Sequence, residues 1–110
     1  MNYTIRTAKP TDMKEVLGLI QELAVFEKEP DAVEVTEDEL IRDGFGSSAA
    51  FQCFVAEKEA RIIGIALVYP RYSTWKGVVL HLEDLIITQS QRGTGVGSAL
   101  LKRVVDYAKN

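Results

Sequence analysis

The stretch that decides the interpretation of this chain is Gln91-Arg92-Gly93-Thr94-Gly95-Val96-Gly97-Ser98, with three glycines at alternate positions. It lies between a long apolar run, residues 78–87, which predicts a strand, and residues 98–109, whose apolar spacing predicts a helix. Glycine has no Cβ, so several amide groups of such a turn can converge at the positive end of the helix. This arrangement is typical of a turn that binds a phosphate or diphosphate.

Two other phosphate-binding motifs do not fit this turn. A P-loop requires Gly-Lys-Ser or Gly-Lys-Thr, which the chain lacks, and the dinucleotide fingerprint requires a third glycine where Ser98 stands. The plainer alternative is a turn that only connects a strand to a helix, but such a turn rarely requires three alternating glycines.

Outward from the turn, strand and helix patterns alternate. The expected elements are a strand at 3–7, a helix from 13 to about 26, a short helix before Gly44 and Gly46, strands at 51–57, 61–69 and 78–87, and a helix at 98–109, with loops at 30–35 and 70–76. Three consecutive strands joined by short connections favour antiparallel pairing. The order β-α-α-β-β-β-α therefore predicts an α+β fold with a mostly antiparallel sheet.

Local signals place the helices within this order. Asp12 with Glu15, and Thr36 with Glu39, have the spacing of a capping box, which predicts helix starts at both places. In the last helix, the side chains expected to face inward are Leu100, Leu101, Val104, Val105 and Ala108.

Length and composition exclude several classes of protein. The chain has 110 residues, 46% of them hydrophobic and 26% charged, with a formal net charge of −3, which indicates one globular domain. A slightly acidic chain is a poor candidate for binding nucleic acid, and no apolar run approaches the roughly 20 residues of a membrane helix. A single cysteine, Cys53, excludes an internal disulfide and a multi-cysteine zinc site. We expect a cytoplasmic protein with no metal and no signal peptide.

The stretch Arg92 to Gly97 matches the Arg/Gln-x-x-Gly-x-Gly/Ala signature of the GNAT superfamily of N-acetyltransferases, which the chain resembles. Among its branches, the chain is most similar to the spermidine/spermine, or diamine, N-acetyltransferase-like proteins. The matching segments outside the turn are Ile5-Arg6 with Ala8, Leu19-Ile20-x-Glu22-Leu23-Ala24, Glu27, Thr36-Glu37, Asp43-Gly44-Phe45-Gly46, Val55-Ala56-Glu57, Trp75 and Leu82-Glu83-Asp84.

The resemblance implies acetyl-CoA as the cosubstrate, with its diphosphate on the turn and its pantetheine paired with the backbone of strand 78–87. The expected cofactor-binding residues are Leu85, Ile86, Ile87, Arg92, Gly93, Thr94, Gly95, Val96, Gly97 and Ser98. Backbone N–H groups near Leu85 can also polarise a thioester carbonyl as an oxyanion hole. The side chains of residues 85–87 are expected in the core, and only their backbone is assigned to the cofactor.

An amine substrate must be attracted as a cation and then lose a proton, which calls for carboxylates. The resemblance implies that Glu83 and Glu27 bind the amine, with Glu83 as the catalytic residue and Phe26 and Trp75 as further substrate-binding residues. The alternative for both acids is a solvated side chain. This alternative is less favoured for Glu83, because an unpaired carboxylate inside an apolar strand is costly. Trp75 can pack on an alkylammonium chain or serve as lid or core packing.

Three neighbouring residues are expected to have structural roles. Asp84 should alternate to the other face of the strand from Glu83, and His81 should share the face of Glu83 as a packed side chain, with a role as base the weaker alternative. Cys53 is expected in the core, because no base partner is evident.

One position departs from the polyamine enzymes. They carry an acid two residues before the tryptophan, where this chain has Ser73. The missing charge makes a shorter diamine, a lysine-like amine or another small amine as good a candidate as a long polyamine.

The resemblance also implies strands and a helix beyond Asn110, including a tyrosine that protonates the leaving thiolate. We therefore expect residues 1–110 to form a single, C-terminally incomplete N-acetyltransferase domain. The exposed edge of strand 78–87 is expected to pair with another chain, most simply in a homodimer. The alternatives are a non-catalytic module that binds CoA or only self-associates and, less favoured, a generic phosphate-binding α+β domain.

Overall fold

The computed structural model describes residues 2–109, and within them it confirms the predicted element order. The strands are β1 (Thr4–Thr7), β2 (Gln52–Lys58), β3 (Arg61–Ser73) and β4 (Gly77–Ile87). The helices are α1 (Met13–Phe26), α2 (Glu37–Gly44) and α3 (Val96–Ala108), with 3-10 turns η1 (Pro10–Asp12) and η2 (Gln89–Gln91). No helix in this part of the chain is both long enough and apolar enough to cross a membrane.

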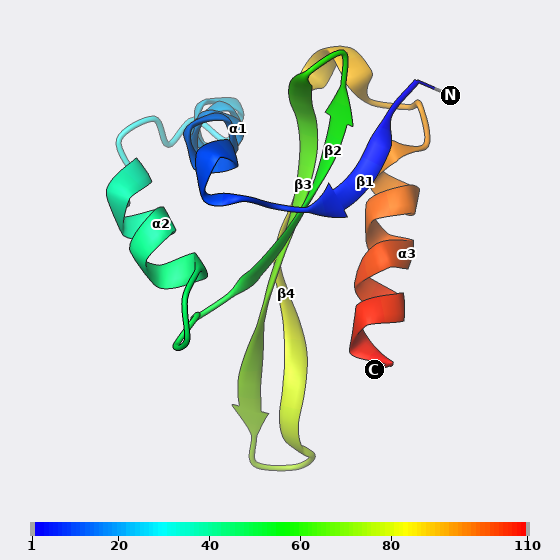
Figure 1. Cartoon of the computed structure of the whole chain (residues 1–110). Helices are drawn as coiled ribbons and strands as arrows, with labels where there is room; N and C mark the ends of the chain where they lie inside the picture. The colour runs from blue at the N-terminus through cyan, green and yellow to red at the C-terminus, as the bar shows by residue number, and fades with distance from the viewer. Residues whose placement is uncertain (1, 110) are drawn as a thin grey trace.

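The four strands form one antiparallel sheet in the order β1-β2-β3-β4. Helices α1 and α2 lie on one side of the sheet and α3 lies on the other (Figure 1). Helices on both faces explain why residues 53–56 of β2 and 62–68 of β3 are apolar on both sides, since neither face of these segments meets water. The α+β prediction is confirmed.

Each face of the sheet carries its own apolar core. Beneath α1 and α2, the buried side chains include Met13, Val16, Leu40, Val55 and Ile65. Beneath α3, they include Phe54, Ala66, Val68, Leu100 and Val104. Gly64 allows β3 to pack closely against the end of β4, because a Cβ there would lie 2.8 Å from Cδ1 of Ile87 and 3.2 Å from the Ile86 carbonyl oxygen.

The hairpin between β3 and β4 is longer than the sequence predicts. Residues 70–76 were expected to form a loop, but β3 continues to Ser73 and leaves only residues 74–76 for the turn. Pro70 lies beyond Val68, the last β3 residue that pairs with β2, so the missing N–H of the proline does not interrupt the β2–β3 ladder. The resulting two-stranded ribbon projects beyond the rest of the sheet (Figure 1).

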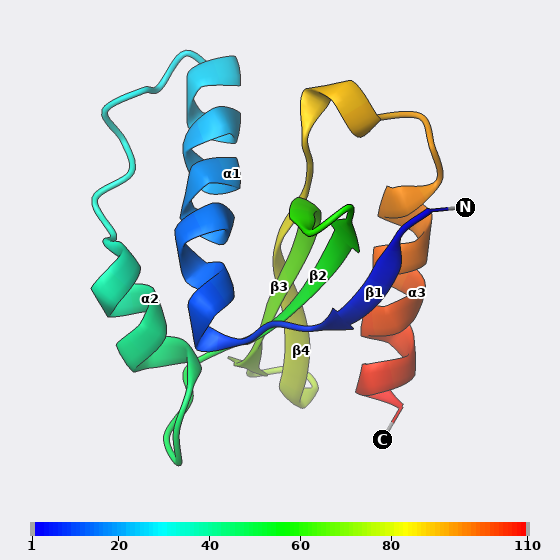
Figure 2. The same cartoon turned by 45° about the horizontal axis from the view of Figure 1, so that its top comes forward.

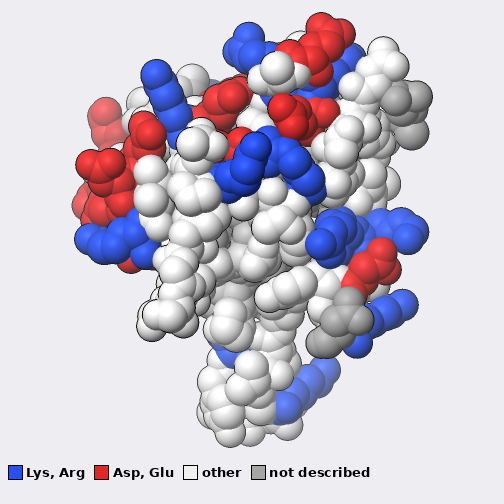
Figure 3. All heavy atoms as spheres, in the orientation of Figure 1, with Lys and Arg blue, Asp and Glu red and all other residues white. Residues whose placement is uncertain are grey.

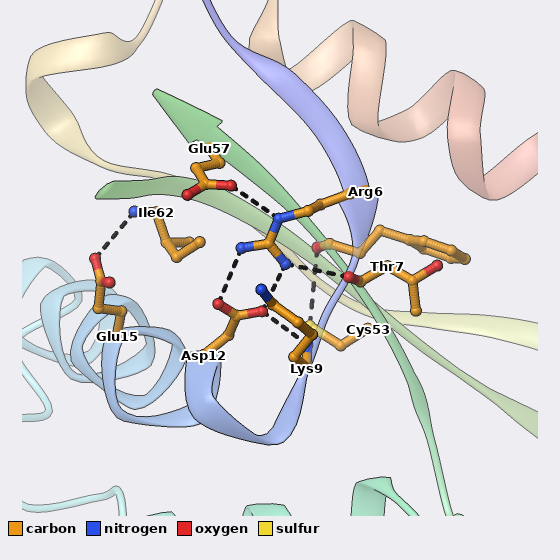
Figure 4. Close-up of polar contacts among 9 residues, drawn as sticks. Arg6, Thr7, Lys9, Asp12, Glu15, Cys53, Glu57 and Ile62 are labelled. Atoms are coloured by element: carbon orange, nitrogen blue, oxygen red, sulfur yellow. Dashed lines mark hydrogen bonds and ion pairs between the residues drawn. The ribbon is translucent and has the colours of Figure 1, made fainter. Parts of the chain in front are cut away.

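Helix α1 begins where predicted but without the predicted capping box. The Asp12 carboxylate instead accepts hydrogen bonds from the Lys9 amide at 2.7 Å and from two Arg6 guanidinium nitrogens at 2.7 and 3.0 Å (Figure 4). Glu15 accepts from the Ile62 amide of β3 at 2.9 Å. The Asp12 carboxylate therefore binds Arg6 rather than an amide of α1. This ion pair lowers the pKa of Asp12.

The second capping box is confirmed. The Thr36 hydroxyl accepts from the Glu39 amide at 3.1 Å, and the Glu39 carboxylate accepts from the Thr36 amide at 3.0 Å. The Thr36 and Glu39 amides lie at the start of α2, where the helix backbone offers them no acceptor, so the capping box satisfies both of them.

Helix α3 buries a narrower stripe than predicted. Leu100 and Val104 are buried, whereas Leu101 and Val105 are 43% and 44% exposed and Ala108 is also exposed. Each residue advances the helix by about 100°, so the neighbour of a buried residue turns toward the side of the helix. The expectation that all five face inward is wrong for these three.

Candidate active site

A β-bulge in β4 lies at Glu83. Leu67 of β3 pairs with Asp84, whereas the next β3 residue, Val68, pairs with Leu82. Glu83 is therefore the extra residue and has no direct partner on β3. A bulge breaks the alternation of side chains between the two faces of a strand, and bulges often occur beside active sites. This one divides β4 into residues 77–82 and residues 84–87.

The bulge brings three carboxylates into one region. Burial raises the pKa of Asp84, and the negative charges of Glu83 and Glu27 raise it further. Glu27 caps the C-terminal end of α1, so the acids come from two elements far apart in the sequence. The charges of Glu27 and Glu83 thus both act on Asp84. Within residues 2–109, no three acidic, histidine or cysteine side chains form a group able to hold a metal ion.

The expected environments of the two acids in β4 are exchanged. Glu83, expected inside an apolar strand, has a side chain that is 53% exposed. Asp84, expected to be structural, is the half-buried acid with the raised pKa. The sequence could not show this, because alternation along a strand gives no sign of a bulge. Asp84 is therefore the functional candidate that the sequence analysis missed.

His81 shares the side of Glu83, as predicted. Its Nε2 lies 3.7 Å from Oε1 of Glu83, and its ring packs on Tyr69 with centroids 5.1 Å apart. Cys53 is 3% exposed, and burial raises the pKa of its thiol to about 12, so it is a core residue as expected.

The glycine turn connects η2 to α3 and has the open geometry that the sequence suggested. Gly93 and Gly95 adopt left-handed conformations with φ of 80° and 87°, which side chains disfavour. No atom lies within 4 Å of the position that a Cβ would occupy at either residue. Gly97 has ordinary backbone angles and room for a Cβ, which would only touch Ile87 at 3.7 Å, so packing within the chain does not require a glycine there.

The amide groups of this turn are available to a ligand. Within residues 2–109, the amides from Gly93 to Ser98 donate to no acceptor in the chain, and the first internal bond of α3 is from the Ala99 amide to the Gly95 carbonyl at 3.1 Å. Helix α3 begins at Val96, two residues earlier than predicted, so the last three of these amides lie in its first turn. These residues fit a diphosphate group, which free amides at a helix N-terminus favour.

Arg92 attaches the turn to its surroundings. Its Nε donates to the Ile87 carbonyl oxygen at 3.1 Å, and its guanidinium lies 5.1 Å from the centre of the Phe26 ring. Beside this pair is a cavity of about 400 Å³, lined by Glu22, Val25, Phe26, Gln89 and Arg92. Phe26 and Arg92, assigned from the sequence to amine and cofactor binding respectively, are therefore in direct contact.

The outer edge of β4 is open. Among the described residues, β4 pairs with β3 alone, so the backbone groups on its other edge have no strand partner. Ile86 is buried at 3%, Ile87 is partly buried and Leu85 is 39% exposed. The core role of these side chains holds for Ile86 and Ile87, whereas Leu85 lies largely at the surface.

One chain does not bring Trp75 to the carboxylates. Trp75 is 93% exposed in the turn of the β3–β4 hairpin. Residues 77–83 of β4 lie between them, and at about 3.3 Å per residue they span roughly 20 Å. The other predicted amine-binding residues, Phe26, Glu27 and Glu83, lie near the other end of β4.

Comparisons with known proteins agree with this geometry. Residues 14–110 match the sequence profile of the Acetyltransferase (GNAT) family. The chain is 41% identical to human spermidine/spermine N(1)-acetyltransferase-like protein 1, over 96% of this chain and 16% of that protein. It is 40% identical to the Bos taurus thialysine N-epsilon-acetyltransferase, over 94% of this chain and 66% of that protein. The chain thus spans less than two thirds of the length of either relative.

Two solved structures show the same fold. An aminoglycoside acetyltransferase from an uncultured soil metagenomic sample, in complex with sisomicin, superimposes with a TM-score of 0.76 at 17% identity, over 97% of this chain and 70% of that one. The glucosamine-6-phosphate N-acetyltransferase from Arabidopsis thaliana gives 0.73 at 20% identity, over 99% and 76%.

Proposed function

Because the chain belongs to the acetyltransferase (GNAT) family, we propose that it transfers an acetyl group from acetyl-CoA to a primary amine. The observation that carries the proposal is the layout of β4. Free amides suited to a diphosphate follow its C-terminal end, and three carboxylates surround its bulge at Glu83. A phosphate-bearing acetyl donor and a cationic acceptor can therefore meet along one strand.

The carboxylates select the class of acceptor. The charges of Glu27 and Glu83 disfavour the ionised form of Asp84, and an ammonium group placed beside these acids relieves that repulsion. We propose a small diamine, a polyamine or a lysine-like amine. The names of the relatives, spermidine/spermine-like and thialysine acetyltransferases, support this range.

In the proposed reaction, acetyl-CoA supplies an acyl group activated as a thioester. Glu27 and Glu83 hold the ammonium, and one of its protons passes to a carboxylate or through water to solvent, which frees the nitrogen lone pair. Asp84 is suited to accept this proton, because burial and the neighbouring charges raise its pKa. As the C–N bond forms and the C–S bond breaks, unpaired amides on the outer edge of β4 near Leu85 stabilise the carbonyl oxygen, and the released thiolate takes up a proton.

We also propose a homodimer through the first part of the open edge. The bulge separates residues 77–82, which can pair with a second copy, from residues 84–87, which serve the cofactor. Residues 70–82 contain the basic residues Arg71 and Lys76 but no acidic residue. In Figure 3 the end of the hairpin accordingly shows basic side chains (blue) without acidic ones (red), whereas acidic side chains gather near α2. If Trp75 packs on the amine, it does so from the second copy, since one chain keeps it roughly 20 Å from Glu83.

The proposal is tested by acetyl transfer. The chain is incubated with acetyl-CoA and a panel of diamines, polyamines, lysine and thialysine, and release of the CoA thiol is measured beside mass analysis of the products. Acetylated amine that depends on Glu83 supports the proposal. Saturable CoA binding without any acetylated product favours the non-catalytic module instead.

A further inference from the structure

A carboxylate of α1 holds the segment that leads into the glycine turn. Oε1 of Glu22 accepts a hydrogen bond from the Thr88 hydroxyl at 2.9 Å, and Oε2 accepts one from the Gln89 amide at 2.9 Å. Both oxygens of one half-buried side chain are thus directed at two consecutive residues, Thr88 after β4 and Gln89 at the start of η2. Hydrogen bonds to an ionised acceptor are about twice as strong as neutral ones.

The same segment is fixed from the sheet side. The Thr88 amide donates to the Ile63 carbonyl at 2.9 Å, and the Gln91 amide donates to the Thr88 carbonyl at 2.9 Å. Thr88 is therefore held by β3 through its backbone and by α1 through its side chain. The C-terminal end of α1 lies at the same end of the sheet as the β4–α3 connection (Figure 2).

A second contact from α1 lies one helical turn further along. Phe26, four residues after Glu22 and therefore on the same side of the helix, stacks with Arg92 at the start of the turn. The backbone amides of the turn do not order it, because those of residues 93–98 have no acceptor among residues 2–109, and two of the glycines adopt left-handed conformations. Within the turn, the Thr94 hydroxyl donates to the Gln91 carbonyl oxygen at 2.6 Å, so the turn is tied to η2, which Glu22 holds.

We propose that Glu22 is a positioning residue for the diphosphate turn, which holds residues 88 and 89 so that the amides of residues 93–98 are already oriented when CoA binds. The inference rests on the proposed function, because it assigns Glu22 a role in binding the cosubstrate. A turn ordered in advance loses less conformational entropy on binding, so its affinity is higher. Glu22 itself does not touch the diphosphate.

The chain offers a matched control for this inference. Glu15 lies on the same helix and makes the same kind of bond, from its carboxylate to the Ile62 amide at 2.9 Å, but its target lies at the β2–β3 hairpin. Glu22→Ala and Glu15→Ala each remove one helix carboxylate that anchors a backbone amide. We expect Glu22→Ala to weaken CoA binding about tenfold by calorimetry, and Glu15→Ala to leave it within about twofold of the parent.

Kinetics and hydrogen exchange distinguish positioning from general destabilisation. In Glu22→Ala, the KM for acetyl-CoA should rise about tenfold while the KM for the amine changes little, and exchange should accelerate at the hydrogen-bonded amides of residues 88, 89 and 91 but not in α2. Glu22→Gln, which keeps one acceptor oxygen, should recover part of the CoA affinity. Thr88→Val removes only the hydroxyl, so its effect should be smaller when Glu22 is already alanine.

The outcomes separate this inference from the proposed function. If the parent chain binds no CoA, the proposed function fails, and exchange at the hydrogen-bonded amides of residues 88, 89 and 91 still reports whether Glu22 orders the segment that leads into the turn. If the parent binds CoA and a folded Glu22→Ala variant binds it equally well, the positioning role is overturned while the function stands. Equal losses in Glu22→Ala and Glu15→Ala also overturn it.

Discussion

Asp84, at the bulge of β4, is close enough to Glu27, at the end of α1, for the charge of Glu27 to raise the pKa of Asp84. Burial of Asp84 is the larger cause, and Glu83 adds a second repulsion. The folded chain therefore holds Asp84 in an environment that disfavours its ionised form. Such an arrangement is expected where a cation binds, because the ligand supplies the missing charge.

Replacement of Asp84 by asparagine should stabilise the free protein and impair acetylation. A raised pKa means that the folded chain retains a proton that the unfolded chain has already lost, so the free energy of unfolding falls as pH rises above the ordinary value of 3.8. Asp84→Asn removes this penalty. Thermal melts should show a higher Tm than the parent at pH 7 and a difference that shrinks toward pH 3, whereas kcat should fall. A lower Tm at pH 7 would show that the carboxylate is stabilising.

Replacement of Glu27 by glutamine should weaken amine binding and leave CoA binding unchanged. The substitution keeps the size of the side chain but removes one of the charges that attract the ammonium. We expect the KM for the amine to rise about tenfold, with the larger effect at low salt, because the interaction is electrostatic. The calorimetric Kd for CoA serves as the control. An unchanged KM for the amine at low salt would show that Glu27 does not bind the amine.

Replacement of Gly95 by alanine should weaken CoA binding by more than its effect on stability explains. Gly95 has a φ of 87°, and Gly46, in the loop after α2, has a φ of 98°, with no atom within 4 Å of a Cβ at either position. Both alanine variants should therefore lose about 1 kcal/mol of stability from the strained backbone. CoA affinity should fall only in Gly95→Ala. Similar CoA affinities in the two variants would show that the turn does not bind the cofactor.

The partly buried ion pair between Arg6 and Asp12 should stabilise the start of the fold. Arg6 lowers the pKa of Asp12, so the stabilisation is complete above pH 3.8 and is lost as pH falls through the lowered value. Asp12→Asn should cost about 2 kcal/mol at pH 7 in chemical unfolding, since it leaves a guanidinium with a weaker partner. The cost should diminish in strong acid. A pH-independent difference would indicate a packing effect instead.

Cys53 should not react in the folded protein. Burial raises the pKa of its thiol to about 12, so almost no thiolate exists near pH 8. A thiol reagent should label the native chain very slowly and the denatured chain fully. Cys53→Ala should retain acetyl transfer. Fast labelling of native protein would show that the strand around Cys53 opens readily.

The fold could be predicted well from the sequence because its signals are local. The glycine turn, the apolar strands and the Thr36–Glu39 capping box each depend on neighbouring residues, and each is found near its expected place. The start of α1 was predicted for the wrong reason, since Asp12 is bound by Arg6, a residue of another element. Local patterns carry no information about such competition.

The candidate site could be predicted only in part. The choice of Glu27 and Glu83 required a family resemblance, because neither periodicity nor composition places the end of α1 beside β4. Asp84 was missed because the bulge changes the faces of β4, and a bulge depends on register with β3. The long β3–β4 ribbon, which keeps Trp75 away from the carboxylates, likewise depends on where β2 stops pairing.

The most direct measurement compares two ligands by calorimetry on the parent chain, namely CoA and pantetheine, which lacks the diphosphate. The account predicts saturable binding of CoA and much weaker binding of pantetheine, because the amides of residues 93–98 hold the diphosphate. Equal binding of the two ligands, or no saturable heat with CoA, would contradict it.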